Sequence, residues 1–63
     1  PLQRYTVAVE SATALAEAHR EMSERREEFG TTSIEAIKDI PGGQSFLICH
    51  LDRNWWELAC VSN

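Results

Sequence analysis

Two nearly continuous apolar runs close the chain, and they constrain its fold more than any other feature. Residues 44–51 read QSFLICHL and residues 55–61 read WWELACV, with only the polar residues 52–54 (DRN) between them. A run that is apolar at almost every position is typical of a strand covered on both faces. The short polar connection is typical of a hairpin turn. We therefore expect a sheet whose last two strands form an antiparallel hairpin.

A helical period lies upstream of this hairpin. Between Ser11 and Gly30, apolar or large side chains recur at steps of three and four, and most of the remaining positions are charged. Ser11 or Thr13 can accept hydrogen bonds from the first backbone amides, and Gly30 can adopt the positive φ that often ends a helix. The recurring residues are Leu15, His19, Met22, Arg26 and Phe29. We predict one amphipathic helix over this span, with His19 in a structural role.

The segment between the helix and the hairpin, residues 31–40 (TTSIEAIKDI), fits two patterns. Its isoleucines recur at every third position, as on a short helix, whereas Ile34, Ala36 and Ile40 fit a strand interrupted by a lysine. The length of the segment favours a strand. Residues 41–43 (PGG) then predict a turn that ends it.

The first residues complete the expected order of elements. Residues 4–9 (RYTVAV) are β-branched or aromatic and alternate in character, which predicts a strand with two unlike faces. The order is then strand, helix, strand, strand, strand. We expect a single α+β domain over residues 1–63. Because a chain this short buries only about 60% of its unfolded surface, we also expect a partner, a metal or a disulfide to support it.

Charge and cysteine content exclude some classes of function. The net charge is −4 and the six basic residues are scattered, so we expect no nucleic-acid partner. No apolar run approaches the roughly 18 residues of a membrane span and no targeting signal is visible, so we expect a cytoplasmic protein. Cys49 and Cys60 fall on neighbouring predicted strands, where one disulfide or two reduced thiols are possible. The chain begins at Pro1, which indicates a trimmed start or a piece of a longer two-module protein.

Residues 52–58, DRNWWEL, resemble a motif of a known family. They are similar to the Asp-Gly-Asn, two apolar residues, Glu, Leu signature of the vicinal oxygen chelate superfamily, which includes glyoxalases, bleomycin-resistance proteins and extradiol dioxygenases. The βαβββ order and the turn before the hairpin resemble this family as well. The resemblance implies half of a curved, eight-stranded bowl, completed by a second βαβββ module, and we expect a homodimer.

The resemblance also implies a divalent metal, which can be Fe, Mn, Ni, Zn or Mg, enclosed between the two modules. In the family, carboxylate ligands come from the last strand of a module and His or Gln ligands from the first strand. Glu57 matches the carboxylate position and is the expected catalytic and metal-binding residue. Gln3 is the expected second ligand if the first strand faces inward there; otherwise this module contributes only Glu57, or the site binds no metal. Arg4 falls where the family usually has histidine, and a guanidinium cannot coordinate a cation. If the first strand faces inward through Arg4, then Arg4, Thr6 and Trp55 line the pocket, because Trp55 shares the face of Glu57 at a spacing of two residues.

The resemblance allows three functions. One is a metal-dependent enzyme, a glyoxalase-like lyase or an extradiol-type dioxygenase, that acts on a small molecule through two adjacent oxygens. Another is a metal-free protein of bleomycin-resistance type, which binds a flat, cationic or aromatic drug. The last is a half-barrel without catalytic activity. An inward Arg4 can pair with Glu57 and fill the site without any cation. His50 is interpreted as a structural turn residue and Trp56 as a core residue against the helix.

Overall fold

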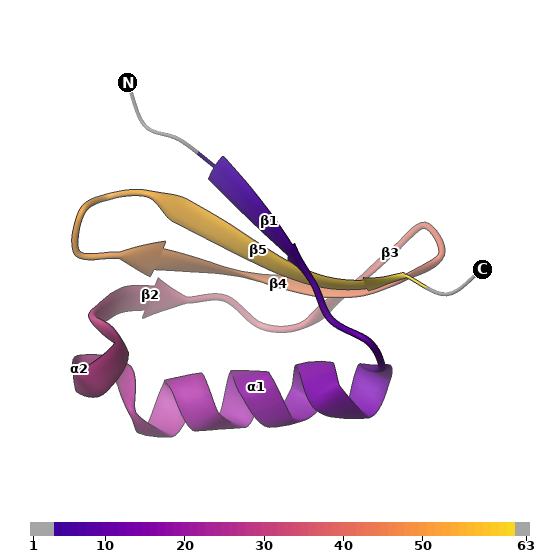
Figure 1. Cartoon of the computed structure of the whole chain (residues 1–63), viewed down its shortest axis with the longest axis horizontal. Coiled ribbons are helices and arrows are strands. Elements are labelled where there is room, and N and C mark those ends of the chain that lie inside the picture. The colour runs from indigo at the N-terminus through magenta and orange to yellow at the C-terminus, as the bar shows by residue number, and fades with distance from the viewer. Residues whose placement is uncertain (1–3, 62–63) are drawn as a thin grey trace.

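Helices and sheet form two layers in the computed structural model, which describes residues 4–61 (Figure 1). The sheet has five strands in the order β1, β5, β4, β2, and β3 also pairs with β4. The strands are β1 (Arg4–Ala8), β2 (Thr31–Ile34), β3 (Lys38–Ile40), β4 (Gly43–His50) and β5 (Trp55–Val61), and the helices are α1 (Ala12–Glu24) and α2 (Arg26–Phe29). Both helices lie below the sheet in Figure 1. The predicted α+β class is therefore confirmed as a small mixed domain with an open sheet.

The closing hairpin forms as the sequence predicts, with β4 antiparallel to β5 from Gly43 opposite Val61 to Cys49 opposite Trp55. Its turn contains the only non-glycine residue with a positive φ among residues 4–61, Arg53 at 70°. Glycine would adopt this conformation without the steric cost that a side chain brings, about 1–2 kcal/mol. β1 joins the outer side of β5 in parallel. This pairing brings the first and last strands of the chain together at one edge of the sheet.

The predicted helix is present but divided in two at Arg25. The Ser11 hydroxyl accepts a hydrogen bond from the Ala14 amide at 3.0 Å, as predicted for the start. Gly30 ends α2 with a φ of 65°. Near the break, the Ser23 hydroxyl donates to the His19 carbonyl oxygen at 2.7 Å. A serine bonded to the carbonyl four residues earlier competes with the helical hydrogen bond and often bends a helix.

The predicted strand over residues 31–40 is two strands, and an inserted residue explains why. β2 pairs Ile34 with Ile48, whereas β3 pairs Lys38 with Ser45. The chain therefore advances four residues from Ile34 to Lys38 while β4 advances only three between their partners. One extra residue of this kind leaves the ladder and reverses which side chains face the helices. Ile37 then packs against the core together with Ile34. The spacing of three between these isoleucines reflects this insertion rather than a helix.

The core is small and lies between α1 and the middle of β4. Leu15, Phe46 and Ile48 are buried, and Trp56 from β5 packs against them as predicted. The His19 ring meets the Phe46 ring edge-on at 4.8 Å, and its Nε2 lies 3.0 Å from the Glu35 carbonyl oxygen. These contacts confirm the structural role predicted for His19. No helix within residues 4–61 is both long and apolar enough to cross a bilayer.

Candidate functional site

The site predicted around Glu57 lies on the face of the sheet opposite the helices. This face, called here the helix-free face, carries side chains that alternate with those of the core. The register places Glu57 beside Thr6 of β1 on one side and Leu47 of β4 on the other. Its side chain is 18% exposed, although it carries a charge. Glu57 is therefore held by neighbours on a central strand and does not extend into water from a sheet edge.

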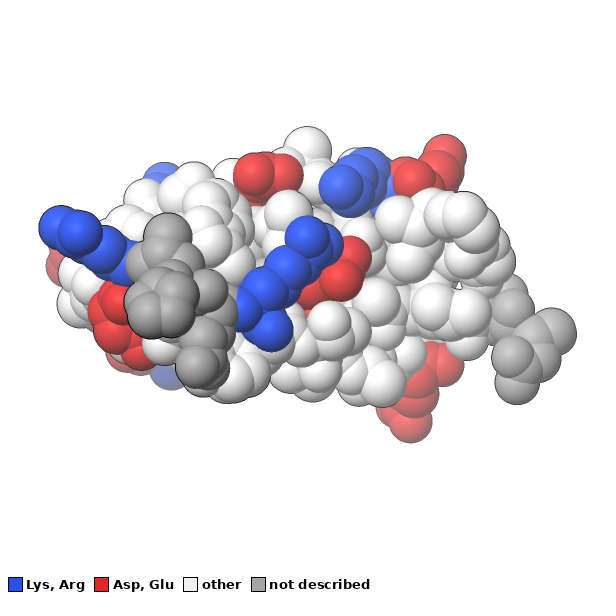
Figure 2. All heavy atoms as spheres, turned by 90° about the horizontal axis from the view of Figure 1, so that it is seen from above, with Lys and Arg blue, Asp and Glu red and all other residues white. Residues whose placement is uncertain are grey.

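Arg4 is the charged partner of Glu57. The register pairs Arg4 with Trp55, which lies two residues before Glu57 and on the same face of β5. Arg4 Nη2 lies 3.4 Å from Glu57 Oε1. The predicted pairing of the two groups is thus confirmed. Figure 2 shows this face from above, where a basic side chain lies against an acidic one on a largely uncharged surface. Because the Arg4 side chain is 57% exposed, solvent screens the pair and its net stabilisation is small, about 0–1 kcal/mol.

The two tryptophans divide between the two faces of the sheet. Trp55 lies on the helix-free face between Arg4 and Cys49 in the register, as predicted from its parity with Glu57. Trp56 lies on the helix side, where its ring stacks on Tyr5 at 4.6 Å. Trp55 can thus form an aromatic wall beside the Glu57 carboxylate.

Ser45 is a feature of the helix-free face that the sequence analysis missed. It pairs with Ala59 on the same face as Glu57, it is completely buried, and its hydroxyl oxygen has no hydrogen-bond partner. A buried hydroxyl without a partner is costly, so such groups are uncommon in native proteins. The only sequence signal was a polar residue inside an apolar run.

Gln3, the second predicted metal ligand, lies outside the described residues. Within residues 4–61, no group of three or more His, Cys, Asp or Glu side chains is close enough to hold a metal ion.

Cys49 pairs with Trp55 and Cys60 pairs with Gln44, so the two thiols are five positions apart along the hairpin, about 17 Å. A disulfide needs Cα atoms within about 7 Å, so the two free cysteines cannot bridge within this chain.

The hairpin turn forms a separate polar cluster around Asp52. Its Oδ1 accepts from the Asn54 amide at 3.0 Å and its Oδ2 from the Asn54 side chain at 3.1 Å. His50 Nδ1 lies 3.3 Å from Oδ1. The Asn54 amide is the main cause that lowers the pKa of Asp52 below 3.8, and the His50 imidazole adds to it. His50, the last residue of β4, is therefore held by contacts with the turn that follows it, in agreement with the predicted structural role.

The lowered pKa of Asp52 predicts the direction of one pH effect. A carboxyl group with a depressed pKa stabilises the fold above its unfolded pKa, near 3.8, and this contribution is lost as the pH falls through the folded pKa. We expect Asp52→Asn, which keeps an acceptor oxygen, to unfold at lower urea concentration at pH 7, with a difference from the wild type that shrinks below about pH 4. Asp39→Asn removes the same charge elsewhere. An equal and equally pH-dependent loss in that control would assign the effect to net charge.

Comparison of the chain with protein-family models, with curated proteins and with solved structures finds no match.

Proposed function

We propose that this chain is one βαβββ module of vicinal oxygen chelate type and that its helix-free face is half of a bowl that binds a small molecule. The second half comes from another copy of the chain. The motif DRNWWEL supports this proposal, and so does the element order when α1 with α2 counts as one divided helix and β2 with β3 as one divided strand. So does the parallel pairing of β1 with β5, which places Arg4, Thr6, Trp55 and Glu57 on one surface.

The Arg4–Glu57 ion pair is the observation that favours one of the possible functions over the others. The carboxylate already has a cationic partner in its own chain, at 3.4 Å, and an aromatic wall beside it in Trp55. A flat cationic molecule fits these features, because its charge can replace the guanidinium and its rings can stack on the indole. The exposed Arg4 side chain is free to move aside, since the pair it leaves is weak. We therefore favour a binding protein of bleomycin-resistance type.

A second copy completes the bowl in this proposal. β1 is an edge strand, and all five of its side chains are exposed. An open edge with unpaired backbone groups is a ready site for pairing with another chain. Leu47 and Trp55 on the helix-free face are only half-buried. Covering them in a dimer would remove apolar surface from water, which favours association.

A divalent cation at Glu57 is the second candidate, favoured by the position of this carboxylate on a central strand at 18% exposure. There the ion would act as a Lewis acid in a glyoxalase-like or extradiol-type reaction. The described residues fit this poorly, because Arg4 occupies the carboxylate and a guanidinium has no lone pair for a metal. A cation would have to displace Arg4 and obtain its other ligands elsewhere.

Titration with the flat cationic dye proflavine tests the favoured function. We expect the dye to co-sediment with a species of two chains. We expect Glu57→Gln to weaken dye binding about tenfold or more, since a hydrogen bond to a charged group contributes about 1.5–3 kcal/mol. Arg4→Ala should strengthen dye binding by removing the competing cation.

The matched control for this titration is Glu28→Gln, which also breaks an ion pair with arginine, Arg25 at 2.6 Å, but on α2. It should leave dye binding unchanged. Dye affinity indifferent to Glu57→Gln would contradict the proposal. Binding of Mn²⁺ or Zn²⁺ by the wild type, abolished in Glu57→Gln, would establish the metal-dependent candidate in its place.

A further inference from the structure

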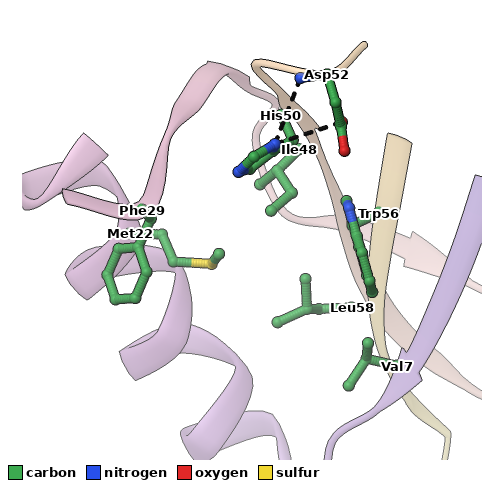
Figure 3. Close-up of a pocket in the computed structure, with 8 residues that line it drawn as sticks. All are labelled: Val7, Met22, Phe29, Ile48, His50, Asp52, Trp56 and Leu58. Atoms are coloured by element: carbon green, nitrogen blue, oxygen red, sulfur yellow. Dashed lines mark hydrogen bonds and ion pairs between the residues drawn. The ribbon is translucent and has the colours of Figure 1, made fainter. Parts of the chain in front are cut away.

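A cavity lies on the helix side of the sheet, between the helices and the β1–β5 edge (Figure 3). Its volume is about 300 Å³. Six apolar side chains from both helices and three strands line it: Val7, Met22, Phe29, Ile48, Trp56 and Leu58. Val7 and Phe29 are 41% and 39% exposed, so this apolar surface is not closed over by the chain itself. The cavity is an open chamber with two aromatic walls.

One end of this cavity is polar and is formed by His50 and Asp52. The Asp52 carboxylate is already engaged, because both oxygens accept hydrogen bonds from Asn54 and Oδ1 faces His50 Nδ1. The Asp52 backbone amide also lies 3.4 Å from His50 Nδ1. These contacts orient the imidazole through one nitrogen. Figure 3 shows the other ring nitrogen, Nε2, pointing away from Asp52 toward the side of Met22 and Phe29.

Gly30 lies beside this nitrogen. A side chain at Gly30 would place its Cβ 2.8 Å from His50 Nε2, closer than non-bonded atoms approach. Glycine at this position therefore lets the imidazole keep the orientation that Figure 3 shows. The imidazole is half-exposed, at 40%. A molecule in the apolar chamber can therefore reach Nε2.

We propose that this cavity binds a small neutral phenol of one or two rings. Its volume lies at the lower end of ligand pockets, about 300–1,000 Å³, which limits the ligand to a small ring system. The indole of Trp56 and the ring of Phe29 suit an aromatic body. A phenol hydroxyl both donates and accepts, so it can bond to Nε2 in either tautomer of His50. A carboxylate would suffer repulsion from the ionised Asp52 beside the imidazole.

This site is independent of the function proposed for Glu57. The register puts Trp56 and Leu58 on the opposite face of β5 from Trp55 and Glu57. A ligand in the cavity and a ligand on the helix-free face therefore contact different side chains. Variants of one face serve as controls for the other.

Calorimetry with 2-naphthol, naphthalene and 2-naphthoate tests the proposal, with methyl NMR to locate the ligand. We expect 2-naphthol to bind about threefold to tenfold more tightly than naphthalene, the effect of one neutral hydrogen bond, and more tightly than 2-naphthoate. Methyl signals of Met22, Ile48 and Leu58 should shift, while those of Leu47 on the helix-free face should not.

Two variants separate the hydrogen bond from the cavity. His50→Phe keeps a ring of similar size, so it should make 2-naphthol bind no better than naphthalene. Met22→Trp should fill the chamber and weaken both ligands, with circular dichroism used to verify that it is folded. Glu57→Gln should change neither affinity.

Any of the following results would overturn the proposal: equal affinity for naphthol and naphthalene in the wild type, tighter binding of naphthoate, or shifts confined to Leu47. Absence of naphthol binding up to its solubility limit would overturn it as well.

Discussion

Phe46→Ala is expected to lower the free energy of unfolding by about 3–5 kcal/mol. The Phe46 ring is completely buried at the centre of a core that contains only two other buried apolar residues, Leu15 and Ile48, among those described. Truncating a buried phenylalanine costs about 3–5 kcal/mol, through lost burial and the cavity left behind. A domain of this length has a total stability of about 3–9 kcal/mol. The substitution therefore removes a third or more of the stability, and in a marginal domain all of it.

Urea denaturation followed by circular dichroism measures this loss. Phe29→Ala is the matched control, because Phe29 is 39% exposed and its ring contacts the Arg25 guanidinium at 5.2 Å instead of the core. We expect this control to lose only about 1 kcal/mol. Phe46→Leu should lose less than Phe46→Ala, since it keeps most of the apolar volume. Equal losses at positions 46 and 29 would show that the core is not organised around Phe46.

Gly43→Ala should be nearly as damaging, although it adds a single methyl group. A Cβ at Gly43 would lie 1.7 Å from the carbonyl oxygen of Cys60 on the adjacent strand. Both groups belong to the paired backbones of β4 and β5, so neither can rotate away, and the strands must separate at this end of the hairpin. We expect a loss of about 3 kcal/mol or more, at the upper end of the cost of overpacking. Slower-exchanging amides near Gly43 should also lose protection against hydrogen exchange.

Gly30→Ala is the informative comparison for Gly43→Ala. Its Cβ meets the His50 imidazole at 2.8 Å, a side chain that can turn aside, and the remaining cost is the left-handed backbone conformation at a φ of 65°. That conformation costs about 1–2 kcal/mol for a residue with a side chain. Denaturation of both variants under the same conditions should give the larger loss at Gly43. The opposite order would contradict the close approach of β4 and β5 at that point.

Substitutions at the two glycines should differ in their effect on the cavity beside His50. A Cβ at Gly30 would displace the His50 imidazole, so Gly30→Ala is expected to change naphthol binding as well as stability. Gly43 lies at the far end of the hairpin from the turn that holds Asp52. A folded variant at position 43 should therefore retain the His50–Asp52 contact.

Local patterns in the sequence were sufficient for several elements. The capped amphipathic helix, the closing hairpin and the opposite faces of Trp55 and Trp56 all follow from periods of 3.6 and two residues, which depend only on neighbours along the chain. The spacing of two residues, which places Trp55 and Glu57 on one face of the strand, is a local pattern of the same kind. The possible contact of Arg4 with Glu57 could be named, but only if the first strand faced inward through Arg4.

Only the tertiary structure determines that the first strand faces inward through Arg4. It also determines the features that the sequence analysis did not predict. Arg4 meets Glu57 because β1 pairs in parallel with a strand some fifty residues later, and such a register is set by packing across the domain and not by local pattern. The extra residue between β2 and β3 turned one predicted strand into two, since both halves must pair with β4 while their isoleucines reach the core. The burial of Ser45 and the cavity beneath Trp56 have the same origin. Ser45 is buried where β4 pairs with β3 and β5, and the cavity forms where the helices meet the sheet; no single segment of the sequence encodes either arrangement.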